Sequence, residues 1–100
     1  MRIIALSTLK TFWIKHPQYN DSKESILAWY QHALTADWNS PASVKNDFGT
    51  ASILKGGRVV FNICGNKYRL VVWINYPYRV IYNRFIGTHK LYDSIDANSI

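Results

Sequence analysis

Three turn signals in the second half of the chain constrain the fold more than any other feature of the sequence. They are the stretches Lys-Gly-Gly-Arg at residues 55–58, Cys-Gly-Asn-Lys at 64–67 and Tyr-Pro-Tyr-Arg at 76–79, separated by apolar-rich runs of strand length. Gly-Gly and Gly-Asn are typical of two-residue hairpin loops, and proline suits the second position of a type I or II turn. The pattern therefore predicts a four-stranded antiparallel meander. Its strands are expected at residues 51–55, 58–64, 67–76 and 79–87.

The first half of the chain has the periodicity of helices. Between Ile26 and Leu34, apolar side chains recur at intervals of three and four residues, which places them on one helical face. Asp21 or Ser22 can cap the start of this helix. Helices followed by a meander predict an α+β fold, in which N-terminal helices pack on one face of a small, mainly antiparallel sheet.

Three shorter elements are also expected. Residues 3–6 are apolar enough for an opening strand. A helix can run from Thr8, as its cap, to His16, because Pro17 would stop it. A further short helix can begin at Pro41, since proline is favoured at the first helical position.

Charge and composition narrow the possible partners and compartments. Lysine and arginine number 12 against 6 acidic residues, and the resulting net charge of +6 favours polyanions, although a basic protein need not bind one. At this length we expect one domain, residues 1–100. Cys64 is the only cysteine, which excludes an internal disulfide and a cysteine-based zinc site and is typical of a reducing cytoplasm. The N-terminal apolar run is too short for a signal peptide or a membrane span, so we expect a cytoplasmic protein without a membrane partner.

The turns also predict the register, which assigns the side chains of the sheet to two faces. We expect Cys64 opposite Lys67 and Tyr76 opposite Arg79, with side chains alternating between faces. A slip of one residue at any turn would exchange the faces. The side chains expected to face the core are Leu54, Val59, Phe61, Ile63, Tyr68, Leu70, Val72, Ile74, Ile81 and Phe85.

The opposite face combines cations with aromatic rings. In this register Arg69 and Arg84 lie diagonally across adjacent strands, within reach of one ligand. Arginines beside exposed aromatic rings suit phosphates and stacked bases, but an open sheet face with solvated arginines has the same pattern. The full set expected on this face is Asn62, Arg69, Trp73, Tyr82 and Arg84, with Val60, Val71 and Ile86 between them.

His89 is the histidine best placed for chemistry. If a helical turn begins near Thr88, His89 shares a face with Tyr92 and Asp93. A histidine at a strand end, close to arginines, can move protons while the arginines hold a phosphate; a structural histidine–aspartate pair is the alternative. The sequence has no phosphate loop, no histidine pair at metal spacing and too few acidic residues for a magnesium cluster. We therefore expect a mechanism without metal or cofactor.

Two motifs resemble those of the HigB toxin family. The stretch VFNICGNKYRL at residues 60–70 is similar to the central hairpin of that family, and RFIGTH at 84–89, followed by Tyr92 and Asp93, is similar to its C-terminal signature. The resemblance spans essentially the whole chain. It implies a RelE-like fold, a ribonuclease that acts on translated mRNA, usually in the ribosome, and a HigA-type antitoxin with a helix-turn-helix domain. DNA would then be contacted only through the antitoxin.

With this resemblance, the expected reaction is attack of a ribose 2′-hydroxyl on the adjacent phosphate, leaving a cyclic phosphate and a free 5′-hydroxyl. Arg69 and Arg84 are expected to stabilise the transition state, His89 to act as general acid or base, and Tyr92 to donate a second proton or bind the phosphate. Further RNA contacts are expected from Asn62, Asn66, Lys67, Trp73 and Tyr82.

Two other functional classes would use the same sheet face. A non-catalytic RNA-binding module needs the arginines and aromatic rings but not His89. A protein-interaction domain would dock a partner chain on this face and need no RNA at all. For two of the expected RNA contacts a structural role is also open: Asn66 can simply shape its turn, and Trp73 can simply pack on the sheet.

Overall fold

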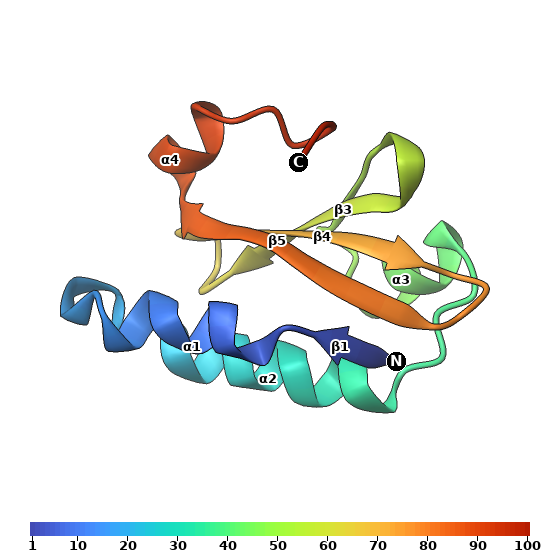
Figure 1. The fold of residues 1–100 in the computed structure, drawn as a ribbon, viewed down its shortest axis with the longest axis horizontal. Helices are drawn as coiled ribbons and strands as arrows, with labels where there is room; N and C mark the ends of the chain where they lie inside the picture. The colour runs from blue at the N-terminus through green and yellow to red at the C-terminus, as the bar shows by residue number, and fades with distance from the viewer.

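The computed structural model describes residues 1–100, which form four α-helices and a five-stranded mixed sheet (Figure 1). The sheet order is β1-β5-β4-β3-β2, with β1 parallel to β5 and the other neighbours antiparallel. The predicted α+β, RelE-like arrangement is confirmed. The elements are β1 (Arg2–Ile4), α1 (Leu6–Ile14), η1 (Pro17–Tyr19), α2 (Ser22–Thr35), α3 (Pro41–Asp47), β2 (Ser52–Ile53), η2 (Lys55–Gly57), β3 (Arg58–Ile63), β4 (Tyr68–Asn75), β5 (Val80–Thr88) and α4 (His89–Asp93).

The elements lie in layers on either side of the sheet. Figure 1 shows α1 and α2 side by side along one face, while α4 and the C-terminal segment lie on the other. Side chains of the helices and of the first sheet face form a core of 17 buried residues. Eight of the ten side chains predicted to face the core belong to it: Val59, Phe61, Ile63, Tyr68, Leu70, Val72, Ile74 and Ile81.

The two remaining core predictions, Leu54 and Phe85, are wrong, and each has a register explanation. Ser52 pairs with Val60 and Ile53 with Val59, so the loop before β3 holds three residues rather than the two expected from Gly-Gly. The difference of one residue turns Leu54 to the opposite face, where it packs against Val60 and Val71.

A β-bulge displaces the second half of β5. The predicted pairs Trp73–Tyr82 and Ile74–Ile81 are confirmed, but the register shifts between Val71 and Val72, and Val71 pairs with Phe85 instead of Arg84. Arg84 is the extra residue of the bulge. Beyond it the faces are exchanged relative to the prediction. Phe85 joins the cluster around Val60 and Val71, and Ile86 packs against the main core.

The turn between β3 and β4 has the predicted register, but its backbone conformation differs from the predicted one. Asn62 pairs with Arg69, as expected. The residues in the left-handed region are Cys64 (φ 55°) and Gly65 (φ 67°), whereas a Gly-Asn turn would place Gly65 and Asn66 there.

The helix starts differ in detail from the predictions. α1 begins at Leu6, and Thr8 is an exposed residue inside it rather than its cap. Asp21 occupies the capping position of α2 but makes no capping hydrogen bond, because its carboxylate accepts from Lys67 and Tyr68. The predicted start of α3 at Pro41 is confirmed.

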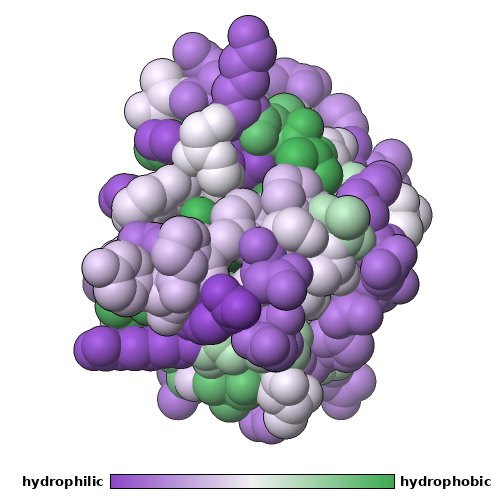
Figure 2. Space-filling view, turned by 90° about the vertical axis from the view of Figure 1, so that its right-hand side faces the viewer, coloured by the Kyte–Doolittle hydropathy of each residue, from purple (hydrophilic) through white to green (hydrophobic).

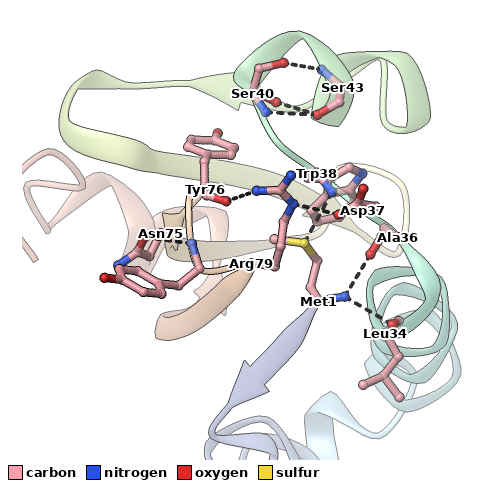
Figure 3. Close-up of polar contacts among 11 residues, drawn as sticks. Met1, Leu34, Ala36, Asp37, Trp38, Ser40, Ser43, Asn75, Tyr76 and Arg79 are labelled. Atoms are coloured by element: carbon pink, nitrogen blue, oxygen red, sulfur yellow. Dashed lines mark hydrogen bonds and ion pairs between the residues drawn. The ribbon is translucent and has the colours of Figure 1, made fainter.

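Close contacts at one end of the sheet hold the N-terminus and the β4–β5 turn together (Figure 3). The Met1 ammonium donates to the carbonyls of Leu34 (3.1 Å) and Ala36 (2.8 Å) at the end of α2. The Arg79 guanidinium donates to Asp37 at 2.6 Å and also to the Tyr76 carbonyl. These contacts keep β1 aligned along β5. Seen from this end, the surface is largely hydrophilic, with apolar residues in separate patches (Figure 2).

The same close-up shows why α3 begins where it does (Figure 3). The Ser43 backbone N–H donates to the Ser40 hydroxyl at 3.4 Å, and the Ser40 backbone N–H donates to the Ser43 hydroxyl at 3.2 Å. This reciprocal pair gives both N–H groups a side-chain acceptor in the first turn of the helix, where the regular helical hydrogen bonds have not yet begun. No helix in the chain has the length and apolar character needed to cross a bilayer.

Candidate functional site

His89 forms the centre of a polar cluster where β5 passes into α4. Its Nε2 lies 2.8 Å from Nη2 of Arg69, and its Nδ1 lies 3.4 Å from the Asp93 carboxylate. The Tyr92 ring is 6.4 Å from the imidazole and 5.8 Å from the Arg69 guanidinium. We call Arg69, His89, Tyr92 and Asp93 the His89 cluster. The structure thus brings together three of the four predicted catalytic residues.

Local structure explains how the His89 cluster is held. Thr88 caps α4, its hydroxyl accepting from the Leu91 backbone N–H at 3.2 Å, so the helical turn predicted to begin near Thr88 is confirmed. Arg69 on β4 lies opposite Gly87 on β5. A Cβ at Gly87 would lie 2.6 Å from the tip of the Phe85 ring, so a larger residue there would have to displace that ring.

The contact between Arg69 and His89 fixes the proton positions on the imidazole. A guanidinium only donates hydrogen bonds, so Nε2 of His89 must accept with its lone pair. In this contact the imidazole hydrogen lies on Nδ1, the ring nitrogen 3.4 Å from the Asp93 carboxylate, with which it forms no hydrogen bond. The lone pair of Nε2 therefore lies beside a cation, with a carboxylate near the other side of the ring.

The charge of Arg69 is not neutralised within the chain. Arg69 makes no ion pair, and its buried Nε has no hydrogen-bond partner. Buried polar atoms in native proteins usually have a partner, so this atom indicates a guanidinium that is incompletely satisfied without a ligand. An anion next to Arg69 would supply both the missing charge and further acceptors.

Arg84 lies in a second group on the same sheet face. Trp73 and Tyr82 are cross-strand neighbours whose rings stack at 4.9 Å. The Arg84 guanidinium lies 6.0 Å from the Trp73 ring and 5.9 Å from the Tyr82 ring. Arg84 is exposed and has no carboxylate partner. We call these three residues the Arg84 cluster. The predicted diagonal placement of Arg84 next to Arg69 is wrong, because the bulge moves β5 by one residue.

The backbone at Gly57 packs closely against the indole of the Arg84 cluster. A Cβ at Gly57 would lie 2.7 Å from the Ile74 carbonyl oxygen and 3.0 Å from Nε1 of Trp73. Gly57 also has a positive φ of 78°, which favours glycine. The η2 turn therefore packs tightly against the indole and fixes its position.

The C-terminal segment crosses the face beside these two clusters, which the sequence did not lead us to expect. Ala97 is buried against Val60 and Val71, and the Arg58 guanidinium donates to the Ile100 carbonyl at 3.2 Å. We call this apolar group the tail cluster. Its signal in the sequence was the pair of valines on a face predicted to be open, since apolar side chains there need a cover. Its partly buried members are Leu54, Phe85, Tyr92, Ile95 and Ile100.

The remaining predicted RNA contacts are divided between this face and elsewhere. Asn62 pairs across the strands with Arg69 and lies on its face. Asn66 and Lys67 lie in the β3–β4 turn, and Lys67 forms an ion pair with Asp21 at the start of α2. The structure does not bring these two turn residues into either cluster.

The side chains whose pKa differs clearly from its ordinary value lie outside both clusters. Hydrogen bonds from Lys67 and then Tyr68 lower the pKa of Asp21, and the Asp21 carboxylate in turn raises the pKa of Lys67. Hydrogen bonds from His32 and Trp38 lower the pKa of Asp47. Burial is the main cause of the raised pKa of Tyr68. These side chains connect neighbouring elements of the fold.

No group of three or more His, Cys, Asp or Glu side chains is arranged to hold a metal ion.

The fold and the His89 cluster can now be compared with known proteins. Residues 22–95 match the family described as HigB_toxin, the RelE-like toxic component of a toxin–antitoxin system. The chain belongs to the HigB toxin family. The matched residues include β3, β4, β5 and α4, and so all members of both clusters. The resemblance seen in the sequence motifs is confirmed.

Curated relatives of this HigB-family chain extend over nearly its full length. They are the mRNA interferase toxin HigB of Escherichia coli strain K12 and the proteins named mRNA interferase HigB of Escherichia coli O157:H7 and Shigella flexneri. Each is 29% identical over 99 residues, covering 97% of this chain and 92% of the relative. Membership of a toxin–antitoxin family also implies that this chain has an antitoxin as its partner.

Proposed function

We propose that this HigB-family chain is an mRNA interferase, a metal-independent endoribonuclease that cleaves mRNA on the ribosome. The observation that carries the proposal is the 2.8 Å contact between His89 and Arg69, which places a proton acceptor beside an unneutralised cation. Residues 1–100 would act as one toxin domain in the cytoplasm, where translated mRNA is found. Curated relatives that carry the name mRNA interferase support the same activity.

The proposed reaction begins at the ribose 2′-hydroxyl. Arg69 moves from His89 Nε2 to the phosphate, and Nε2 then takes the proton of this hydroxyl as its oxygen attacks the adjacent phosphorus. The nearby Asp93 carboxylate stabilises the imidazolium that forms. The new bond joins the 2′-oxygen to phosphorus, and the bond from phosphorus to the 5′-oxygen breaks. Tyr92 donates a proton to the departing 5′-oxygen. The products are a 2′,3′-cyclic phosphate and a free 5′-hydroxyl.

The two arginines would stabilise the charge that develops on the phosphate. Arg69 lies next to the proposed base, and one well-placed donor of this kind contributes about 3–4 kcal/mol to transition-state stabilisation. Arg84 would bind a neighbouring phosphate or the scissile one, since it is exposed above its two rings. Trp73 and Tyr82 would offer the outer surface of their stack to a base.

The roles proposed for the other predicted RNA-binding residues follow from where these residues lie in the fold. Asn62 would position the substrate beside Arg69, its cross-strand neighbour. Asn66 and Lys67 would meet RNA only away from the two clusters, since both lie in the turn and Lys67 is already paired with Asp21. We further propose that the antitoxin is a HigA-type protein with a helix-turn-helix domain, so that DNA is contacted only through it.

The test is induced expression of the wild-type chain beside His89→Ala, with mRNA ends mapped after induction. We expect growth arrest and new cleavage sites for the wild type and neither for the variant. Lys23→Ala, which removes an exposed cation on α2, is the control and should behave as wild type. Intact messages at normal growth, with folded protein present, would exclude the ribonuclease.

The non-catalytic RNA-binding module is the alternative that the Arg84 cluster favours, because stacked rings under an arginine suit bases whether or not RNA is cut. RNA affinity of purified His89→Ala separates the two functions. Loss of cleavage with retained affinity supports the enzyme. If the wild type binds RNA as tightly as the variant but leaves it intact in translating extracts, the binding module is the better description.

A further inference from the structure

Arg2 is a further arginine that has no carboxylate partner and lies on the sheet face of the two clusters. It is exposed on β1, which pairs in parallel with β5 through Arg2–Val80 and Ile4–Tyr82. Ile3 packs against the main core, so the alternation of side chains turns Arg2 to the opposite face, the one that carries Tyr82. The charge of Arg2 is therefore available to a ligand on that face.

The stacked rings of the Arg84 cluster are not capped by its arginine. Trp73 and Tyr82 come from neighbouring strands, and their ring centroids are 4.9 Å apart, close to the spacing between strands, so the stack runs across the sheet. The Arg84 guanidinium is 6.0 Å from one ring and 5.9 Å from the other. Equal distances place it at the rim of the stack, because a cation over one outer surface would be much farther from the second ring. Both rings also keep part of their surface exposed.

The tail cluster separates these rings from the His89 cluster. On β4, Val71 lies between Arg69 and Trp73 on the same face and is buried with Ala97 of the C-terminal segment. Arg69 and Trp73 are four residues apart on one strand, a span of about 13 Å. A stacked nucleic-acid strand advances about 3.4 Å per nucleotide, so about four stacked nucleotides, or fewer extended ones, would cross this span above the tail. A base held by the Arg84 cluster therefore lies outside the two nucleotides that the cleaved bond joins.

We propose that this face binds one RNA strand at three separate points: the cleaved bond at the His89 cluster, a base outside that bond at the Arg84 cluster, and a more distant phosphate at Arg2. Val80, the partner of Arg2, precedes Tyr82 on β5, whereas His89 follows the end of that strand. The three points therefore follow one another along β5, with Arg2 farthest from the cleaved bond.

Single-stranded RNA suits this arrangement better than an acidic protein segment does. Both ligands would pair with the cations, but bases also stack on partly exposed rings such as those of Trp73 and Tyr82. Arginines without a carboxylate partner release counterions from the phosphates that they neutralise, which adds affinity without reading the sequence. The inference rests on the proposed function in taking RNA as the ligand, but it does not require cleavage.

The test measures binding of two fluorescently labelled RNAs, one of roughly three and one of roughly twelve nucleotides, to the purified chain by anisotropy at several salt concentrations. Both are 2′-O-methylated and so cannot be cut. The long RNA can reach all three points and should bind the wild type about 5-fold to 150-fold more tightly, the effect of one further stacked base. Arg2→Gln should weaken the long RNA up to about fivefold and reduce its salt slope by about 0.7, the value for one phosphate contact of a single strand. The short RNA occupies one point at a time and should bind the variant like wild type.

Lys23→Gln is the matched control, since it removes the same charge from an exposed position of α2 on the helix-covered side, and it should leave the salt slope unchanged. A slope for the long RNA that is equal in Arg2→Gln and wild type overturns the role of Arg2. Equal affinity of the wild type for both RNAs, or no binding of the long one, overturns the separate points. Competition by poly-glutamate as strong as by unlabelled long RNA would overturn the inference in favour of an acidic protein partner. Cleavage of unmodified mRNA by the wild type reports the proposed ribonuclease separately, so either proposal can fail alone.

Discussion

The two faces of the sheet differ in how completely their side chains are partnered. On the helix-covered face, apolar residues form the core, and at its margin Asp21 is paired with Lys67 and Asp47 with His32. On the other face, Arg69 and Arg84 have no carboxylate partner. The first face therefore accounts for stability, and the second retains unneutralised charge for a ligand outside the chain.

Leu70 and Arg69 are neighbours on β4 that point to opposite faces, so they test this difference most sharply. Leu70→Ala should lower the free energy of unfolding by about 2–5 kcal/mol, because it leaves a cavity in the core. Cleavage by the fraction that remains folded should be unchanged. Urea unfolding followed by circular dichroism measures the first, and an assay at low temperature the second.

Arg69→Ala should have the converse effect. We expect the cleavage rate to fall about 10²–10³-fold, the usual loss for one transition-state donor, while the unfolding midpoint changes little. Single-turnover cleavage of a defined message in a translating extract would measure this, with Lys23→Ala as the control. A variant that cuts normally would show that Arg69 is not part of the catalytic site. A variant that unfolds would show that Arg69 is needed for stability instead.

Trp73→Ala tests whether the Arg84 cluster binds bases. Stacking of one base on an aromatic ring contributes about 1–3 kcal/mol, so RNA affinity should fall by between about 5-fold and 150-fold. Tyr78→Ala removes an aromatic ring that is 79% exposed in the β4–β5 turn and should not change affinity. Equal losses for both variants would mean that the ring pair of Trp73 and Tyr82 has no special role.

Ser40→Ala probes a local structure that belongs to neither face. Loss of the capping hydroxyl of α3 should lower the free energy of unfolding by about 1 kcal/mol without altering RNA binding. Thermal unfolding of the variant and the wild type gives the difference. A larger loss would indicate that α3 contributes more to the core than its cap alone.

Asp21→Asn should give the smallest effect, and one that depends on pH. The folded state lowers the pKa of Asp21 below its ordinary 3.8, so its ion pair and hydrogen bond stabilise the fold above about pH 4 and are lost as the carboxylate protonates on further acidification. Asp21→Asn should be less stable than wild type at neutral pH, and the difference should shrink below about pH 4. Thermal midpoints between pH 2 and 7 measure it. A difference that stays constant with pH would assign the effect to packing instead.

Most of the sheet could be predicted from the turns, because a short turn determines the register of the two strands that it joins. Two strand pairs that flank a short loop leave few alternatives, and Ile63–Tyr68 and Ile74–Ile81 were predicted correctly. The bulge at Arg84 was not predicted, because it has no marker in the local sequence: it depends on how β5 meets β4 beyond the reach of the turn.

The candidate site was predictable in part for the same reason. His89 and Tyr92 lie three residues apart on α4, so their common face could be inferred from spacing. The contact between Arg69 on β4 and His89 at the start of α4 depends on the register of β4 with β5 beyond the bulge, which the turn between these strands does not determine. The tail cluster depends on packing of the last residues onto Val60 and Val71, which no periodicity in residues 94–100 indicates.

The bulge imposes a requirement on chain length rather than on residue type. Ile81 faces the main core before it, and Phe85 faces the tail cluster after it, although both have odd numbers in one strand. In plain alternation Phe85, four residues after Ile81, would face the main core with it, but the bulge takes up one residue and turns Phe85 to the tail cluster. A strand of the same length without the bulge would therefore carry Phe85 to the wrong side of the sheet, whereas deletion of Arg84 together with the bulge would leave Phe85 where it is. The number of residues from Ile81 to His89 and the bulge together determine on which side α4 leaves the strand, even where the side chains between them can vary.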